Sequence, residues 1–194
     1  MARRKGLTFY EKKKKISKET IHEIFSTIFS CFAAILLASV IVFSVGIKVS
    51  VIGVSMSPLL QNGEEVLINR FKYKVFSPQR GEVIAFLPNG NTNSHYYLKR
   101  VVGLPGEKIQ IIDGYVYING ELLEEDESYD KIADPGIAAS EILLGSDEYF
   151  VLGDNRNFSE DSRSGNIGPV SKDTITGKAW FHLGGKETEM GFVE

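Results

Sequence analysis

An uncharged apolar stretch near the N-terminus is the feature that most constrains how this chain can fold. It runs from Ile24 to Ile47 without one charged side chain. As an α-helix rising about 1.5 Å per residue it would be roughly 36 Å long, enough to cross a bilayer with some tilt. Cleaved signal peptides have shorter apolar cores and end in an Ala-x-Ala-like site, whereas Lys48 and the bulky Val49 follow this run. We therefore expect a retained transmembrane helix over residues 24–47.

The two sides of this run differ in charge. Residues 1–23 contain eight lysines and arginines and three glutamates, a net charge of +5, and the remainder contains 14 basic and 22 acidic residues, a net charge of −8. Cytoplasmic flanks of membrane helices are enriched in lysine and arginine, so we expect residues 1–23 to form a cytoplasmic tail near anionic lipid headgroups. A solvated tail or a nucleic-acid-binding arm is the alternative. The adjoining apolar run favours the membrane, so no nucleic acid is expected as a partner.

Residues 48–194 are enough for one extracytoplasmic domain with a single core. That domain has no cysteine, since Cys31 lies in the apolar run, so no disulfide can stabilise it. The three histidines, His22, His95 and His182, lack the spacing of metal ligands, and no phosphate-binding or dinucleotide-binding motif is present. We expect neither a metal nor a cofactor.

The pattern of this domain predicts a mainly β fold made of antiparallel strands. Short runs rich in β-branched and aromatic residues, each bounded by turn residues, predict strands at 66–68, 83–86, 96–102, 109–112, 115–118, 149–152 and 175–181. Asp113-Gly114 and Asn119-Gly120 predict two type I′ turns and hence a three-stranded meander over 108–123. The acidic segment 124–147 is expected to be a surface excursion. Segment 71–76 is expected to be either a half-buried strand or a contact with lipid headgroups.

Two short motifs indicate hydrolytic chemistry. Ser55 lies in the block 53–60 soon after the apolar run, and Lys99 lies in the block 97–103. A serine hydroxyl needs a base to take its proton, and no histidine here has the context of a Ser/His/Asp triad. A lysine buried between Leu98 and Val101 would lose its charge more easily and could be that base.

A polar loop over 153–163 follows the predicted strand at 149–152. With the serine block 53–60, the strand block 81–86 and the lysine block 97–106, it makes the chain resemble bacterial type I signal peptidases of the short, single-anchor form common in Gram-positive bacteria. The resemblance implies coiled antiparallel sheets and a membrane-anchored serine endopeptidase that uses a Ser/Lys dyad. It also implies that the substrates are signal peptides of secreted preproteins, close to membrane lipid and the translocation machinery.

The same resemblance implies roles for individual residues. Ser55 would be the nucleophile, Lys99 the general base, and Ser159 the hydroxyl that holds the lysine amine in line. Four charged side chains would brace the loop, with the last two forming an ion pair: Asp154, Arg156, Asp161 and Arg163. Shallow pockets for small substrate side chains would be lined by Val51, Met56, Leu60 and Leu98.

Gly53 departs from the pattern of Gram-negative relatives, which have a serine there as a second donor to the oxyanion beside the backbone N–H of Ser55. We expect Gly53→Ser to be tolerated, provided that the glycine is not needed for a positive φ angle.

Three alternatives remain open. His95 could be the base, as in relatives from archaea and the endoplasmic reticulum, although the lysine block fits better. A self-cleaving repressor would share the dyad, but a membrane anchor occupies the place of its DNA-binding domain. A catalytically silent single-pass ectodomain that binds exported proteins or the translocation machinery is the reading from a different class.

Overall fold

The computed structural model describes residues 17–185 and 188–193. The chain divides into two compact units, one up to Ser44 and one from Val45 onward. Most of the cytoplasmic tail predicted for residues 1–23 lies outside the described residues.

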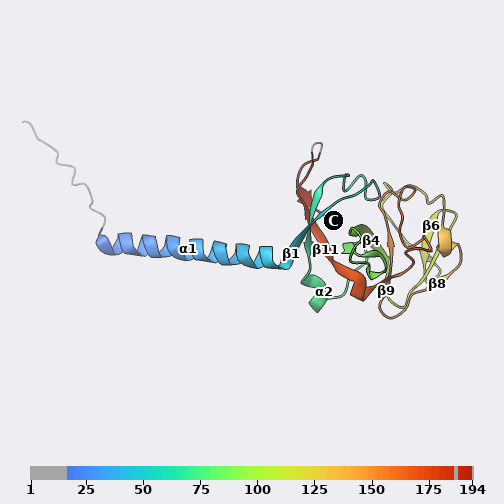
Figure 1. Ribbon diagram of the computed structural model, residues 1–194, viewed down its shortest axis with the longest axis horizontal. Helices are drawn as coiled ribbons and strands as arrows, with labels where there is room; N and C mark the ends of the chain where they lie inside the picture. The colour runs from blue at the N-terminus through green and yellow to red at the C-terminus, as the bar shows by residue number, and fades with distance from the viewer. Residues whose placement is uncertain (1–16, 186–187, 194) are drawn as a thin grey trace, which may run out of the picture. The chain divides into compact units, whose positions relative to one another are not determined.

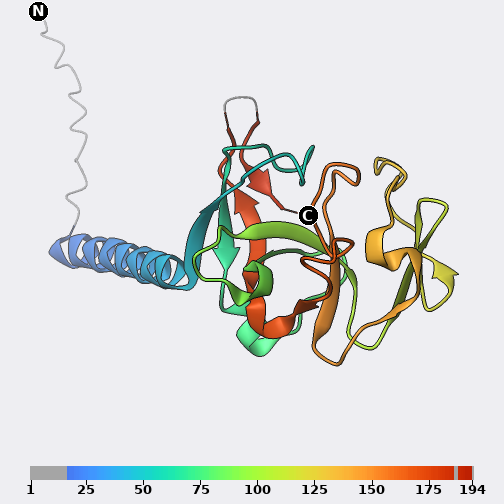
Figure 2. The same ribbon diagram turned by 45° about the vertical axis from the view of Figure 1, so that its right-hand side comes forward.

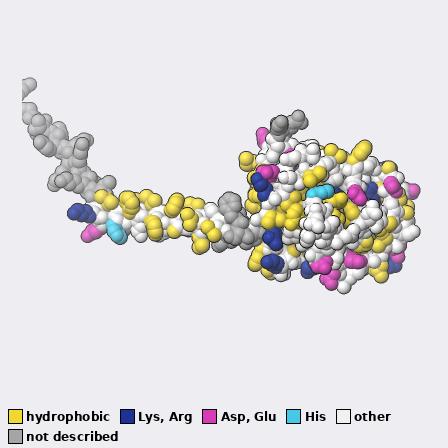
Figure 3. Space-filling view, in the orientation of Figure 1, with side chains coloured by type: hydrophobic (Ala, Val, Ile, Leu, Met, Phe, Trp, Pro, Cys, Tyr) yellow, Lys and Arg dark blue, Asp and Glu magenta, His cyan; other side chains and the backbone are white. Residues whose placement is uncertain are grey.

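The first unit is the helix α1 (Lys18–Val45). Ser17 caps it, because its Oγ accepts the backbone N–H of Thr20 at 3.1 Å. The 23 residues from Lys18 to Val40 have a mean hydropathy of 1.9, and this helix is long and apolar enough to cross a membrane. Apolar side chains lie all along its described part (Figure 3). The helix begins six residues before the predicted span because of the Ser17 cap, and it ends where Gly46 begins a strand.

The larger sheet of the second unit has eight strands, and every pairing is antiparallel. Its order is β1-β2-β11-β3-β4-β9-β10, with β12 paired to β11 (Figure 1). The strands are β1 (Gly46–Ser50), β2 (Glu65–Asn69), β3 (Val83–Phe86), β4 (Tyr97–Gly103), β9 (Glu148–Leu152), β10 (Val170–Ser171), β11 (Ile175–His182) and β12 (Gly191–Phe192). The prediction of a mainly antiparallel β domain after one apolar helix is confirmed.

The smaller sheet contains the predicted meander. Its order is β7-β6-β5-β8, and its strands are β5 (Lys108–Ile112), β6 (Tyr115–Ile118), β7 (Glu121–Leu122) and β8 (Ile142–Leu143). Asp113 and Asn119 have φ angles of 51° and 52°, and the glycine after each is also positive, as type I′ turns require. Figure 2 shows this sheet at the end of the domain away from β1 and β2, and Figure 1 agrees.

Two segments differ from the sequence-based expectation. Residues 71–76 contain a short helix, α2 (Lys72–Val75), rather than a strand. At its start, Asn69 Oδ1 accepts the backbone N–H groups of Phe71 and Lys72, as side-chain caps do at helix starts, and Lys72 pairs with the buried Glu82. The segment 124–147 is more than a surface excursion. It contains β8 and a 3-10 turn, η2 (Gly136–Ala139), and buries Ala138 and Leu144 in the core beside the smaller sheet. Two further 3-10 turns are η1 (Pro88–Gly90) and η3 (Lys172–Thr174).

The loop between β1 and β2 is fixed by the core beneath it. Met56 is 1% exposed and Leu60 is fully buried, so both sides of the turn that follows Ser55 pack inward. The Val51 N–H donates to the Glu64 carbonyl at 2.8 Å, and the Gly63 N–H donates to the Val51 carbonyl at 2.9 Å. These contacts hold both ends of the loop, so Ser55 sits on a rigid support.

Candidate active site

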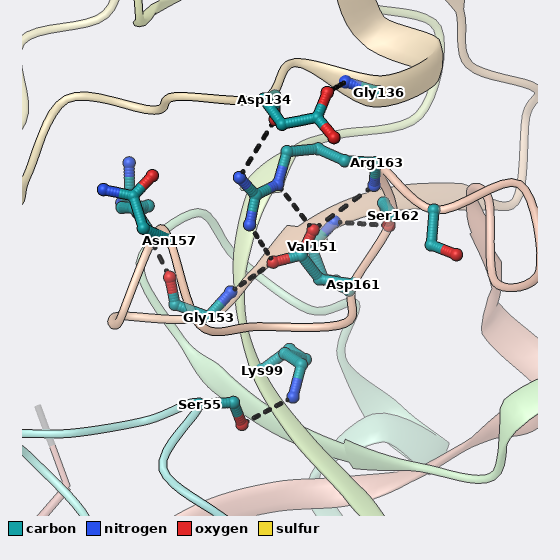
Figure 4. Close-up of polar contacts among 12 residues, drawn as sticks. Ser55, Lys99, Asp134, Gly136, Val151, Gly153, Asn157, Asp161, Ser162 and Arg163 are labelled. Carbon is teal, nitrogen blue, oxygen red and sulfur yellow. Dashed lines mark hydrogen bonds and ion pairs between the residues drawn. The ribbon is translucent and has the colours of Figure 1, made fainter.

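Ser55 and Lys99 meet in space although 44 residues separate them. Lys99 lies near the middle of β4, directly across from Ile84 of β3, and its side chain is directed at the loop that carries Ser55. Its Nζ lies 2.8 Å from Ser55 Oγ and donates to the Leu98 carbonyl at 3.2 Å (Figure 4). Lys99 is only 4% exposed. A buried amine is therefore within hydrogen-bond reach of an activatable hydroxyl.

Burial is the main cause of an unusual pKa at Lys99. Removal from water disfavours the ammonium form and lowers the pKa from its ordinary value of 10.5 to about 8. Nearby carboxylates oppose this change, in the order Asp161, Glu160 and Asp154. The net result is an amine that can be neutral at mildly alkaline pH.

Asn155 ties the serine loop to the loop that follows β9. Its backbone N–H donates to the Ser55 carbonyl at 3.1 Å, and its Nδ2 donates to the Val54 carbonyl at 3.2 Å. The sequence did not single out this residue, although it lies inside the recognised block 153–163. These two hydrogen bonds, one from the backbone and one from the side chain, join two loops that are far apart in the sequence, so a motif does not reveal them.

Gly153 explains how closely these loops approach. A Cβ at this position would collide with the Ser55 carbonyl oxygen and with Ser159 Oγ. The absence of a side chain is thus required here for contact, and any larger residue would separate the two loops.

Ser159 lies in this crowded region, but its hydroxyl does not bond to the lysine. Its Oγ is buried and has no hydrogen-bond partner among the described residues. The hydrogen bonds of the Lys99 amine go to Ser55 and Leu98 instead. The assignment of Ser159 as the group that orients Lys99 therefore stays a prediction.

Asp161 and Arg163 form the expected ion pair at the centre of the loop. Arg163 Nε and one terminal nitrogen donate to the two oxygens of Asp161, each at 2.8 Å. Asp161 Oδ2 also accepts the Gly153 N–H at 3.0 Å (Figure 4). A fully buried carboxylate with three such donors fixes the turn that faces Lys99.

Asp154 and Arg156 are paired with residues outside their own loop. Asp154 accepts two hydrogen bonds from Arg100 of β4, both at 2.8 Å. Arg156 makes two hydrogen bonds to Glu125, at 2.7 and 2.8 Å, and its guanidinium lies 4.2 Å from the ring centre of Tyr129. The sequence identified the loop residues but missed these partners, because Glu125 and Tyr129 lie in the segment that was expected to be surface.

A cleft of about 320 Å³ adjoins the Ser55 and Lys99 side chains. Three of the four predicted pocket residues, Val51, Met56 and Leu98, line it. Leu60 does not, since it is completely buried in the core. His95 lies on the rim, where its ring stacks on Tyr97 at a centroid distance of 5.0 Å.

Gly53 has a φ angle of +84°. Its N–H donates to Asn62 Oδ1 at 2.8 Å, and no atom lies within 4 Å of the site where a Cβ would be. Space is therefore available for a serine, but the backbone conformation opposes it. The condition under which we expected Gly53→Ser to be tolerated is not met.

No group of three or more His, Cys, Asp or Glu side chains among the described residues could hold a metal ion.

Comparisons with known proteins identify the family of this chain. A family model described as signal peptidase, peptidase S26, matches residues 23–183. The chain is 34% identical over 171 residues to signal peptidase IB of Staphylococcus aureus, covering 77% of this chain and 86% of that relative. It is 37% identical over 130 residues to a probable signal peptidase I-2 of Synechocystis, covering 65% of this chain and 57% of that relative. The chain thus spans little more than half the length of the Synechocystis protein.

A solved structure of a signal peptidase I from Enterococcus faecalis V583 is 31% identical, with a TM-score of 0.41, and covers 53% of this chain and 97% of its own. The family model spans most of the sequence, from within the apolar helix to the end of β11. On that match and on the Staphylococcus relative, this chain belongs to the signal peptidase S26 family of peptidases.

Proposed function

We propose that this protein is a membrane-anchored serine endopeptidase that removes N-terminal signal peptides from exported preproteins by means of a Ser55/Lys99 dyad. The observation that supports this most strongly is the 2.8 Å approach of the Lys99 amine to Ser55 Oγ in a buried site where the lysine pKa falls to about 8. A base must lie within hydrogen-bond reach of the proton it takes and must be unprotonated when it does so. The distance meets the first requirement, and a pKa of about 8 lets a fraction of Lys99 be neutral near neutral pH.

The proposed reaction begins with neutral Lys99 taking the proton of Ser55 as Oγ attacks the scissile carbonyl carbon. The carbonyl oxygen becomes an oxyanion, for which the Ser55 backbone N–H is the proposed donor. No described residue occupies that N–H with a hydrogen bond. The Lys99 ammonium then returns the proton to the leaving amine, and the acyl-enzyme forms. Lys99 next takes a proton from a water, whose oxygen attacks the acyl carbon. The Lys99 ammonium returns that proton to Ser55 Oγ as the bond between Oγ and the acyl carbon breaks.

Asp154, Arg156, Asp161 and Arg163 are proposed to support this reaction by keeping their loop rigid. Every one of the four has an ionic partner, and the loop contacts the serine loop through Asn155 and Gly153. A displacement of about 1 Å in a catalytic group can cost on the order of 10² in rate. A loop held in place by buried ion pairs would prevent such a displacement.

The proposed substrate is an extended segment with small side chains one and three positions before the cut. Val51, Met56 and Leu98 are apolar and line the cleft, and we propose that they form the pockets that accept these small side chains. Val51 and Leu98 both line the cleft, and we propose that the substrate segment lies in extended form between them.

Cleavage of a preprotein by the purified full-length protein tests this function. Wild-type protein should release a mature chain, whereas Ser55→Ala should release none. Ser57→Ala, two residues further along the same loop, is the matched control and should remain active. Cleavage that persists in Ser55→Ala, or a wild-type protein that binds the preprotein without cutting it, would overturn the proposal.

We further propose that α1 is a single-pass anchor with the N-terminus in the cytoplasm, near anionic lipid and the translocation machinery. The helix is long and apolar enough, and the charge before it is positive. Protease added to intact protoplasts should digest the domain that carries Ser55 and spare the tail. Digestion of the tail with protection of the domain would reverse the orientation.

A further inference from the structure

The cleft beside Ser55 contains a single carboxylate among the described residues that line it. Most of the lining is backbone and apolar side chain, and the ionisable groups are Lys99, His95, Glu160 and the phenols of Tyr96 and Tyr97. Because the reaction requires neutral Lys99, a carboxylate on the wall would set the electrical sign of the cleft during catalysis. Glu160 is that group.

Glu160 and its neighbour Asp161 have opposite environments. Asp161 is 1% exposed and its charge is met by Arg163 and by the Gly153 N–H. Glu160 is exposed, and its polar contact is the Tyr97 hydroxyl, which lies 3.4 Å from its Oε2. The negative charge of Asp161 is thus compensated inside the protein, whereas the charge of Glu160 lies at the wall of the cleft.

Glu160 is close enough to act on the catalytic amine. Its charge raises the pKa of Lys99, opposing the lowering by burial, alongside the contributions of Asp161 and Asp154 and against that of Arg163. Tyr97, its hydrogen-bond partner, has its ring centre 5.3 Å from Lys99 Nζ. A substrate bound over Ser55 would lie in the same field.

The rim next to Glu160 is apolar. Phe158, two residues earlier on the same loop, is 72% exposed, and Ile52 and Val54 across the cleft are 60% and 49% exposed. Lysine and arginine side chains combine a long aliphatic stem with a terminal cation. Their stems would cover this apolar rim, while the cation reached the carboxylate.

We infer that Glu160 is a specificity-determining residue that favours preproteins with a lysine or arginine near the scissile bond and disfavours those with an aspartate or glutamate there. The inference rests on the proposed function. It adds a charge preference to the requirement for small side chains, and Glu160 serves substrate choice rather than bond cleavage.

Competition between peptide substrates tests the inference. We would use a leader peptide with the small residues one and three positions before the cut kept constant. Lysine, glutamine or glutamate would be introduced singly at the other positions within three residues of the bond. At one or more positions, wild-type kcat/KM should be about threefold to tenfold higher for lysine than for glutamate at low salt, since Glu160 would attract the first side chain and repel the second across a partly exposed cleft. High salt should reduce the ratio.

Variants of Glu160 should change this ratio in a graded way. In Glu160→Gln the ratio should fall below about twofold, and in Glu160→Lys it should reverse. Glu121→Gln is the matched control, because it removes the same charge from β7 in the smaller sheet and should leave the ratio unchanged. Glu160→Gln should also move the acid limb of kcat/KM to lower pH, since one charge that stabilises the Lys99 ammonium is gone.

Failure of the inference and failure of the proposed function would give different results. Equal wild-type rates for the lysine and glutamate peptides at every position overturn the inference, as does a preference that survives Glu160→Gln. A loss of rate that is the same for all peptides, without a shifted acid limb, would make Glu160 merely structural and also overturn it. If wild-type protein cleaves no peptide at all, the proposed function fails instead.

Discussion

Lys99 and Arg100 are neighbours on β4 and place largely buried cations on opposite faces of the strand. Their pKa values change in opposite directions. Burial lowers the pKa of Lys99, and the nearby carboxylates do not form an ion pair with it in the described structure, so its pKa falls to about 8. Burial also lowers the pKa of Arg100, but the hydrogen bonds and charge of Asp154 more than reverse this, and the pKa is raised. Pairing with a carboxylate therefore accounts for the opposite directions of the pKa change at these two buried cations.

The two faces of β4 have different roles. The Lys99 face meets the Ser55 loop, where the proposed reaction moves a proton, and no carboxylate forms an ion pair with the amine in the described structure. The Arg100 face meets the loop after β9, which must stay in place, and it pairs the guanidinium at both nitrogens with a carboxylate that is 5% exposed. A single β-strand can supply both because successive side chains point to opposite faces.

Removal of the unpaired cation should have the largest effect on activity. Lys99→Met keeps the length and apolar stem of the side chain but removes the proposed base, and we expect preprotein cleavage to fall by about 10³ or more. Single-turnover cleavage assays measure this. Lys108→Met on the exposed surface of β5 is the control and should cleave at the wild-type rate. Near wild-type turnover of Lys99→Met would refute the dyad and direct attention to His95.

Stability should respond in opposite directions on the two faces. Arg100→Met leaves the buried Asp154 charge without its partner, which typically costs about 3–5 kcal/mol in the free energy of unfolding. Lys99→Met instead removes an amine whose protonation is opposed by folding. A pKa lowered from 10.5 to about 8 corresponds to about 3 kcal/mol of destabilisation.

Because folding lowers the pKa of Lys99, the stability difference between Lys99→Met and wild type depends on pH. The cost of burying Lys99 is fully present below about pH 8, where the folded state would also bind the proton, and it disappears above about 10.5. Lys99→Met should therefore be more stable than wild type at pH 7 and equal to it at pH 11. Denaturant unfolding of the full chain in detergent measures both variants. A Lys99→Met protein that is less stable at pH 7 would contradict the assignment of Lys99 as an unpaired buried cation.

The pH dependence of activity should follow the unpaired cation as well. Because neutral Lys99 is the reactive form, kcat/KM should rise about tenfold per pH unit below its pKa and level off above about pH 8. The raised pKa of Arg100 adds no limb in this range. Initial rates between pH 6 and 10 on one peptide give the profile. An acid limb near the ordinary lysine value of about 10.4 would mean that the amine is solvated during turnover.

The sequence predicted features that depend on residues close together in the chain better than contacts between distant segments. Strands and hairpins rest on local alternation and on turns such as Asp113-Gly114, and each run expected to be a strand overlaps one in the structure. The strands β1, β8, β10 and β12 were not predicted. The burial of Lys99 was also foreseeable, since apolar neighbours flank it on its strand. The partners Glu125 and Asn155 were not foreseeable, because they depend on how two distant loops meet and no short-range pattern encodes that contact.

Gly53 offers the smallest and most discriminating test, because sequence comparison and backbone geometry make opposite predictions there. If the missing serine hydroxyl of Gram-negative relatives were all that mattered, Gly53→Ser would raise turnover. The φ angle of +84° instead predicts a loss of about 1–2 kcal/mol in stability for any side chain with ordinary backbone preferences. Gly53→Ala should lose as much as Gly53→Ser, whereas Gly53→Asn should lose less, since asparagine tolerates positive φ. Unfolding midpoints and cleavage rates of the three variants decide the point. A serine variant as stable as wild type and faster in cleavage would show that the loop can adjust its backbone and that a second oxyanion donor limits this enzyme.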